Sequence, residues 1–202
     1  NTLEGPNSKS DGCLPIDPKV ITTDPDLQSI VSSGSGITNI AVLEFDFVPS
    51  TSKVTFRYRF GSEEYPQWAG TSWNDVFGFF ISGPGISGKK NIALLPDNTS
   101  VSINNVNDGN RTYSWQNCPR AYNHPDYISN PQLAPKNKDL YVSVPACWSR
   151  VNCSTTPAMM GEVAVATYKA TELNGLTVVL EATADVIPCN TYHIKLAIAN
   201  VH

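Results

Sequence analysis

The sequence predicts an all-β protein: a two-sheet antiparallel β-sandwich of jelly-roll type, with one short helix and a long loop stapled by disulfides. Three observations lead to this prediction. The chain contains 13 glycines and 15 prolines, which supply turns and interrupt helices. From residue 39 onward, apolar and polar residues alternate with the period of two that marks a half-buried strand. About eight or nine such segments, separated by turn residues, suffice for two stacked sheets.

Composition and charge limit the compartment and the classes of partner. Charged residues make up only 16% of the 202-residue chain, against about 25% in an average globular domain. A net charge of −4 argues against nucleic acid, because phosphate binding needs a clustered positive field. No apolar stretch approaches the roughly 18 residues of a membrane-spanning helix. We therefore expect an extracellular or cell-surface protein with no membrane span and no nucleic-acid partner.

The five cysteines favour disulfides over a zinc site. Zinc sites use pairs with two residues between the cysteines, whereas the tightest spacing here, Cys147 to Cys153, leaves five residues between them. The pairing stays open, and the odd number leaves one thiol for a neighbouring chain or for another part of the protein. The five positions are Cys13, Cys118, Cys147, Cys153 and Cys189.

Three triplets fit the acceptor pattern for N-glycosylation, which belongs on surface loops of secreted proteins. They begin at Asn98, Asn110 and Asn152. We expect glycans at these positions only if the source of the protein attaches them.

The chain is expected to divide into an extended N-terminal segment, residues 1–23, and one sandwich domain, residues 24–202. The domain carries an irregular insertion at about residues 107–138. Two early prolines, Pro15 and Pro18, exclude regular structure from the N-terminal segment. Because the chain has no signal peptide, we expect a mature product or a fragment.

The domain opens with its one predicted helix. Asp24 is suited to the N-cap and Pro25 to the first helical position. The apolar face of this helix consists of Leu27, Ile30 and Val31, and a Ser-Ser-Gly sequence at residues 32–34 ends it.

The first two strands, residues 39–48 and 53–60, are predicted to form an antiparallel hairpin because only four residues connect them. On the outer face, Glu44 and Asp46 would pair with Arg57 and Arg59 across the strands. The inner face is expected to be buried and consists of Ala41, Leu43, Phe45, Phe47, Val54, Phe56, Tyr58 and Phe60.

Further strands follow from the same alternation and from turn residues. Residues 76–82 are apolar on both faces and end at Gly83-Pro84-Gly85, so this strand should be central. In the last strand, Tyr192 and Ile194 should face inward and His193 and Lys195 outward. The remaining predicted strands are residues 91–95, 101–106, 139–144, 162–168, 176–186 and 191–200.

The loop between the second and third strands carries the candidate binding residues, because polar and aromatic groups gather there on a rigid sheet. Glu63, Glu64 and Asp75 offer the oxygen ligands that Ca²⁺ prefers, with Asn74 beside them. Trp68 and Trp73 could stack on a sugar ring. A structural role is the alternative: the carboxylates would bond loop amides, and the tryptophans would close the end of the sandwich.

Three sequence segments make the chain recognisable: FGSEEYPQWAGTSWNDVFGFFISGPG, NIALLPDNTSVSINNVN and NGLTVVLEATADVIPCNTYHIKLAIANV. With AVLEFDFVP at residues 41–49, they resemble the choice-of-anchor L domain of bacterial secreted proteins over about residues 24–202. The resemblance implies an extracellular β-rich domain of the surface proteins of gliding and biofilm-forming bacteria. It implies no ligand and no catalytic residue.

The sequence departs from the family pattern in three places. Members usually carry further β-rich sequence before the region that matches residue 24, and they continue past residue 202 with an acidic, apolar stretch that completes the last strands, so we expect either a fragment or strands supplied from elsewhere. The Cys-rich region, residues 113–153, is longer than in the usual pattern.

Catalysis is not expected. The histidines are His124, His193 and His202, and no Gly-x-Ser-x-Gly elbow accompanies them. Adjacent glutamates on an extended loop point apart, which disfavours a glycosidase pair. Two hypotheses remain: a module that binds an extracellular glycan or a neighbouring surface protein, with Ca²⁺ at the 61–75 loop, and a self-assembling subunit of an extracellular filament linked by strand addition.

Overall fold

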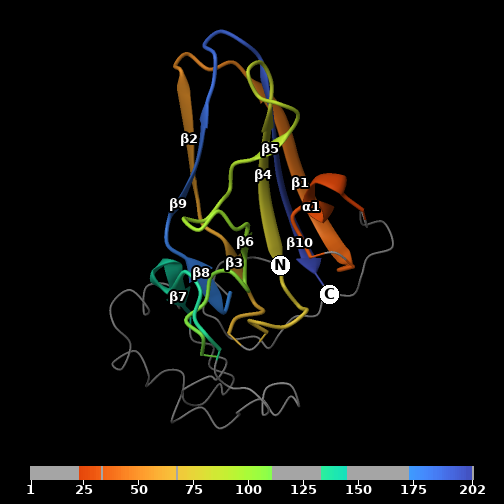
Figure 1. Cartoon of the computed structure of the whole chain (residues 1–202), viewed down its shortest axis with the longest axis vertical. Coiled ribbons are helices and arrows are strands. Elements are labelled where there is room, and N and C mark those ends of the chain that lie inside the picture. Colours follow the sequence, from red (N-terminus) through yellow and green to blue (C-terminus); the bar gives the residue numbers. More distant parts are fainter. Residues whose placement is uncertain (1–22, 33, 67, 111–132, 145–172, 202) are drawn as a thin grey trace.

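The computed structural model describes residues 23–32, 34–66, 68–110, 133–144 and 173–201, and these form mostly antiparallel β-sheet with one α-helical turn and one 3-10 turn (Figure 1). The predicted β class is therefore confirmed. The elements are α1 (Pro25–Gln28), β1 (Ile37–Phe47), β2 (Lys53–Tyr58), β3 (Gly61–Ser62), β4 (Val76–Ser82), β5 (Lys90–Asn91), β6 (Val101–Ser102), η1 (Lys138–Leu140), β7 (Tyr141–Ser143), β8 (Gly175–Thr177), β9 (Leu180–Asp185) and β10 (Tyr192–Val201).

The strands belong to three sheets. The main sheet has the order β1-β10-β4-β5, with β6 also paired to β4. Strands β2 and β9 form a separate two-stranded ribbon, and β3, β8 and β7 form a small sheet in that order. Strand β4 lies inside the main sheet and is buried at most positions, as its two apolar faces predict.

The predicted hairpin between the first two strands is wrong. β1 pairs with β10 in the main sheet, whereas β2 pairs with β9 in the ribbon. The connection at residues 49–52 therefore crosses from one sheet to the other, beside the crossing that joins β9 to β10. Two backbone bonds hold the crossings together: Cys189 N–H donates to the Pro49 carbonyl at 2.9 Å, and Val186 N–H to the Ser52 carbonyl at 2.9 Å.

The charge pairs predicted for that hairpin are wrong for the same reason. Glu44 lies opposite Lys195 and Asp46 opposite His193 in the main sheet. Arg57 instead faces Glu181 across the ribbon, with Nε 3.7 Å from Oε1.

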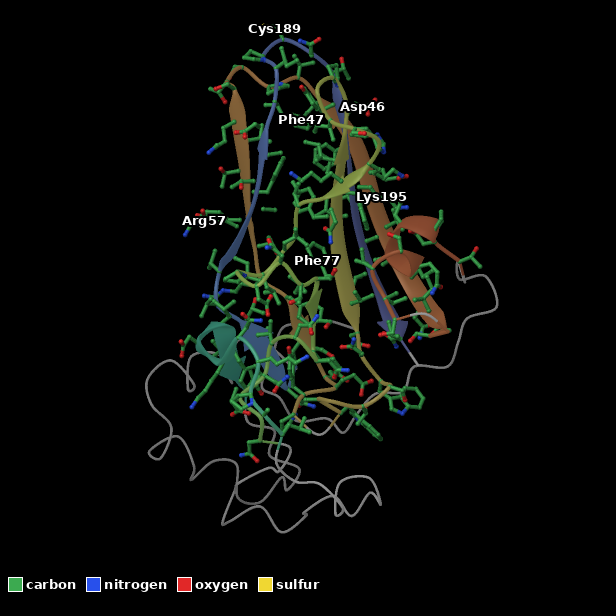
Figure 2. All side chains as sticks on the ribbon, viewed as in Figure 1. Asp46, Phe47, Arg57, Phe77, Cys189 and Lys195 are labelled. Atoms are coloured by element: carbon green, nitrogen blue, oxygen red, sulfur yellow. The ribbon has the colours of Figure 1, made fainter. Side chains whose placement is uncertain are left out.

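The ribbon packs on one face of the main sheet through aromatic rings (Figure 2). Phe56 of β2 lies 4.8 Å from Phe79 of β4 between ring centroids, and Tyr58 lies 5.0 Å from Phe77. Near the crossings, Phe47 of β1 meets the edge of the Phe56 ring at 6.0 Å. These contacts make two β layers, which agrees with a sandwich, while the jelly-roll connection stays a prediction.

The opposite face of the main sheet is covered by the segment that contains α1. The Asp24 carboxylate caps this turn and accepts from the backbone N–H of Asp26 at 3.0 Å and of Leu27 at 2.9 Å, as predicted. The helix is shorter than expected and ends at Gln28. Ile30 and Val31, beyond its end, still pack against the apolar cluster that contains Leu27.

An ion-pair network fastens α1 to the main sheet. The ammonium group of Lys195 is buried, 2.5 Å from a carboxylate oxygen of Asp24 and 2.7 Å from one of Asp26. Lys89 reaches the same Asp26 oxygen at 2.6 Å. Lys195 thus points to the outer face of β10, as predicted, but it is buried there rather than solvated.

Several strands are shorter than their sequence pattern. The predicted strand at residues 176–186 is divided between β8 and β9, which belong to different sheets. The segments at residues 91–95 and 101–106 contribute only short pairings. At residues 139–144, β7 follows a 3-10 turn.

Other predictions lie outside the described residues. These are the strand at residues 162–168, the extended segment apart from Thr23, most of the 107–138 insertion, and four of the cysteines. The fifth, Cys189, is a free, exposed thiol in the turn before β10. The disulfide-stapled loop stays a prediction.

The Lys195 network gives the first test. Lys195→Met should lower the free energy of unfolding by about 3 kcal/mol, because it leaves buried carboxylates without their cation. Lys53→Met is the matched control: its ion pair with Asp185 at 4.0 Å is exposed, so the loss should stay below about 1 kcal/mol. Urea unfolding followed by tryptophan fluorescence measures both variants. Equal losses would contradict the role assigned to Lys195.

Candidate functional site

The 61–75 loop begins in β3, runs to the start of β4 and lies at the end of the described sheets away from Cys189 (Figures 1 and 2). Its two ends are joined by side chains. Ser62 Oγ donates to Asp75 Oδ2 at 2.5 Å and accepts from the Glu64 backbone N–H at 3.0 Å. Burial raises the pKa of Asp75 to about 6, and the nearby charge of Glu63 adds to the increase.

The three predicted calcium ligands stay without a metal assignment. Asp75 and Glu63 are close enough to interact, and both Glu63 and Glu64 are half-buried. Within the described ranges, no three acidic, histidine or cysteine side chains form a group that could hold a metal ion. The calcium site therefore stays a prediction, and no geometry of this loop is specific to it.

Tyr65, which the sequence did not single out, anchors the loop. Its hydroxyl donates to the Val106 carbonyl at 2.6 Å, and the side chain is fully buried. Its ring stacks at an angle against Tyr141, 4.9 Å between centroids, and also lies against Gly175. A Cβ at position 175 would meet this ring at 2.6 Å, so glycine is required there. In the sequence, an aromatic residue within a polar loop was the feature that could have identified Tyr65.

Asn74 forms hydrogen bonds that join the loop to neighbouring segments. The side-chain oxygen of Asn74 accepts from the Asn104 backbone N–H at 2.9 Å, and the backbone N–H of Asn74 donates to the Val201 carbonyl at 3.2 Å. The Asn104 side chain in turn donates to the Thr71 carbonyl at 2.8 Å and accepts from the Gly70 N–H at 2.5 Å. These bonds hold the loop against β6 and the segment that follows it.

The two tryptophans lie together, with ring centroids 6.0 Å apart and planes inclined by 57°. Trp68 is half-buried and packs against the main core, which agrees with the structural alternative. Trp73 is 47% exposed. Of the six predicted binding residues, Trp73 has the largest exposed apolar side chain.

A second surface, which the sequence analysis did not predict, lies on β1 and β10. We call it the β1 strip and define it as Leu43, Phe45 and Ile198, whose side chains are 60%, 39% and 38% exposed. The predicted burial of Leu43 and Phe45 is therefore wrong. Among the described residues, the ribbon consists of β2 and β9, which cover β4 and the crossing end of β1 but not the middle of β1.

The strip adjoins an open sheet edge. In the order of the main sheet, β1 is the outermost strand, and among the described residues it pairs on one side only, with β10. An outermost strand presents backbone N–H and C=O groups that can pair with another chain.

The outer face of β1 is acidic. His193 lies between two carboxylates there, with Nδ1 2.7 Å from Asp46 Oδ1 and Nε2 3.5 Å from Glu44 Oε1 (Asp46 is labelled in Figure 2). The hydrogen bond to Asp46 is the main cause of a raised His193 pKa. His193 is thus in an ion-pair cluster on the sheet surface, at the outward position that the alternation predicts.

The glycosylation triplets are placed in part. Asn98 is exposed in a turn with a left-handed φ of 63°, and Asn110 is half-buried. Asn152 lies outside the described residues. All three stay predictions.

Comparison with known proteins gives one match. The family model described as Choice-of-anchor L domain matches residues 1–202, more than the 24–202 covered by the motifs. Neither curated proteins nor solved structures give a match. No helix in the described part of the chain has the length and apolar character needed to cross a bilayer.

Asp75→Asn tests the buried carboxyl. The raised pKa means that the folded state holds the proton more tightly, so wild-type stability falls as pH rises from about 4 to 6. The variant does not titrate there and still offers an acceptor to Ser62. It should exceed the wild type at pH 8 by on the order of 2 kcal/mol and lose this advantage near pH 4. Urea unfolding at a series of pH values measures the difference.

The calcium hypothesis is tested on the same two proteins, the wild type and Asp75→Asn. If the loop binds Ca²⁺, added Ca²⁺ at pH 8 should raise the melting temperature of the wild type by several degrees and leave Asp75→Asn unchanged. Mg²⁺ at equal concentration is the control. An unchanged wild type would remove the calcium hypothesis.

Proposed function

Because the chain belongs to the choice-of-anchor L domain family, we propose that it is a non-enzymatic association module, which holds its partner through the β1 strip and the open edge beside it. Members of this family are secreted or cell-surface proteins of bacteria. The proposal adds to this setting the kind of contact: a partner strand aligned with β1, with its apolar side chains on the strip.

The exposed Leu43 carries the proposal. A leucine exposed to 60% in the middle of a strand, beside Phe45 and Ile198, places apolar surface in water. The open edge next to it supplies backbone donors and acceptors. Strand addition uses both features together, since main-chain bonds give affinity and alternate side chains give specificity.

The 61–75 loop supports a binding role less well. Asp75, Asn74 and the Glu63 carbonyl accept hydrogen bonds from within the protein: from Ser62, Asn104 and Asn174. Acceptors that are already bonded within the protein have less capacity left for a polar ligand. These bonds also argue for a structural use of the loop rather than a catalytic one.

A glycan-binding role is the second candidate, and Trp73 is the observation that favours it. Its ring is 47% exposed beside Trp68, and a sugar could stack on it. In this case the adhesive contact lies at the loop, at a distance from the β1 strip.

One experiment separates the two candidates. Labelled chain would be added to cells that display the protein, and its retention measured by flow cytometry. We expect Leu43→Lys to lower retention at least about tenfold, because a charge in the strip opposes apolar contact. Val48→Lys is the matched control: Val48 is 61% exposed but lies outside the strip, so retention should stay near the wild-type value.

Trp73→Ala completes the set. Unchanged retention is expected for this variant. The reverse pattern, with loss in Trp73→Ala and none in Leu43→Lys, would reject the strip and support the glycan site.

A further inference from the structure

We propose that the partner of the β1 strip is a second copy of this chain, paired antiparallel to β1 about a two-fold axis at Leu43. This inference rests on the proposed function and deepens it, because it names the partner at the same surface. It follows from the symmetry of strand pairing, from the charges along β1 and from the sizes of the side chains that would meet.

Symmetry limits the possible registers. Directly opposite residues in an antiparallel pair point to the same side of the sheet, and neighbours along a strand point to opposite sides. Two identical strands related by a two-fold axis therefore pair about a residue, not between residues. Each register is named by the residue that faces itself.

The regular part of β1 limits the choice further. Asn39 has a left-handed φ of 52°, and the pairing with β10 shifts between Thr38 and Ala41. Residues Ala41–Phe47 follow without interruption. An extended pairing must be centred near the middle of this stretch, on Leu43, Glu44 or Phe45.

Charge selects among these three centres. An axis at Glu44 places Glu44 opposite itself, and an axis at Phe45 places Glu44 opposite Asp46. Like charges directly opposite each other destabilise a strand pair. Of the three, only the axis at Leu43 keeps the carboxylates from facing each other: Glu44 faces Val42, and Asp46 lies beyond the regular pairing, toward the irregular residues Asn39 and Ile40.

The same register matches the apolar side chains. Leu43 meets Leu43 of the second copy, and in the first copy it lies next to Leu196 on β10. Phe45 of the second copy falls opposite Ala41, a small residue whose neighbour on β10 is Ile198. A large ring thus lies over a small residue and reaches the exposed Ile198, so all three members of the strip gain cover.

The pairing joins two main sheets into one. Strand β1 would no longer be an edge, and its outward N–H and C=O groups would bond those of the second copy. An isologous contact of this kind closes on itself, so it produces a dimer and leaves any filament to a different surface.

Sedimentation velocity over a range of concentrations tests the proposal on the full chain. The wild type is expected to show a reversible monomer–dimer equilibrium. Leu43→Lys and Leu43→Glu should each be monomeric, because each places like charges opposite each other at the axis. An equimolar mixture of the two should dimerise again, since only the mixed pair brings opposite charges together.

Controls address surface charge, disulfides and folding. Val48→Lys and Val48→Glu should dimerise like the wild type, and so should Cys189→Ser, which removes the exposed thiol. Circular dichroism reports whether the Leu43 variants fold. If they do not, hydrogen exchange of the wild type decides: amides of β1 should become protected as concentration rises, and unchanged exchange overturns the proposal.

Three results would overturn the self-pairing. These are a wild type that is monomeric at every concentration, a dimer that persists in both Leu43 variants, and a mixture that stays monomeric. If the wild type is monomeric while Leu43→Lys still loses retention on cells, the strip holds an unlike partner. The proposed function then stands and the second copy is rejected.

Discussion

The architecture depends on two sheet crossings that lie side by side and are bonded to each other. The bonds from Cys189 N–H to the Pro49 carbonyl and from Val186 N–H to the Ser52 carbonyl make both long segments change sheets at the same place. The pairing of β1 with β10 therefore continues as the pairing of β2 with β9 in the other layer. A two-stranded ribbon thus faces a wider sheet, and the open part of that sheet is the surface that we assign to association.

At the opposite end of the described sheets lies a polar loop, whose buried groups must find hydrogen-bond partners within the protein. Buried donors and acceptors are costly unless they are bonded. The loop meets this condition through the bonds from the Ser62 hydroxyl to the Asp75 carboxylate and from the Tyr65 hydroxyl to the Val106 carbonyl, while the Asn174 side chain donates to the backbone carbonyl of Glu63. The bond from Ser62, together with that from the Asn104 N–H to the Asn74 side chain, engages one carboxylate and one amide that make the sequence look like a ligand site. A polar loop in a sequence can therefore indicate either a ligand site or a loop that is bonded internally, and the hydrogen-bond partners of its side chains distinguish the two.

Local features could be predicted from the sequence, whereas the choice of partner strand could not. The Asp24 cap, Pro25 at the start of the turn, and residues 76–82 as a central strand follow from short-range preferences. The period of two identifies β1 and β2 as strands equally well in a hairpin or in two sheets, so the short connection pointed to the wrong partner. The predicted burial of Leu43 and Phe45 is also wrong, because their burial depends on how far the other layer extends over β1. The anchoring role of Tyr65 could not be predicted, because it depends on contacts with Val106 and Gly175, which lie far away in the sequence.

The charges on β1 serve two purposes at once. Edge strands are commonly protected by charged side chains, which prevent uncontrolled pairing. Here Glu44 and Asp46 occupy the outer face of β1, while Leu43 and Phe45 leave the inner face apolar. Complete protection would require charge on both faces. The carboxylates oppose pairing with acidic strands; of the three central registers of β1 with a second copy, they disfavour those about Glu44 and Phe45 and leave the one about Leu43 open. An edge of this composition is therefore selective rather than closed, which is what a surface module needs if it is to associate without aggregating.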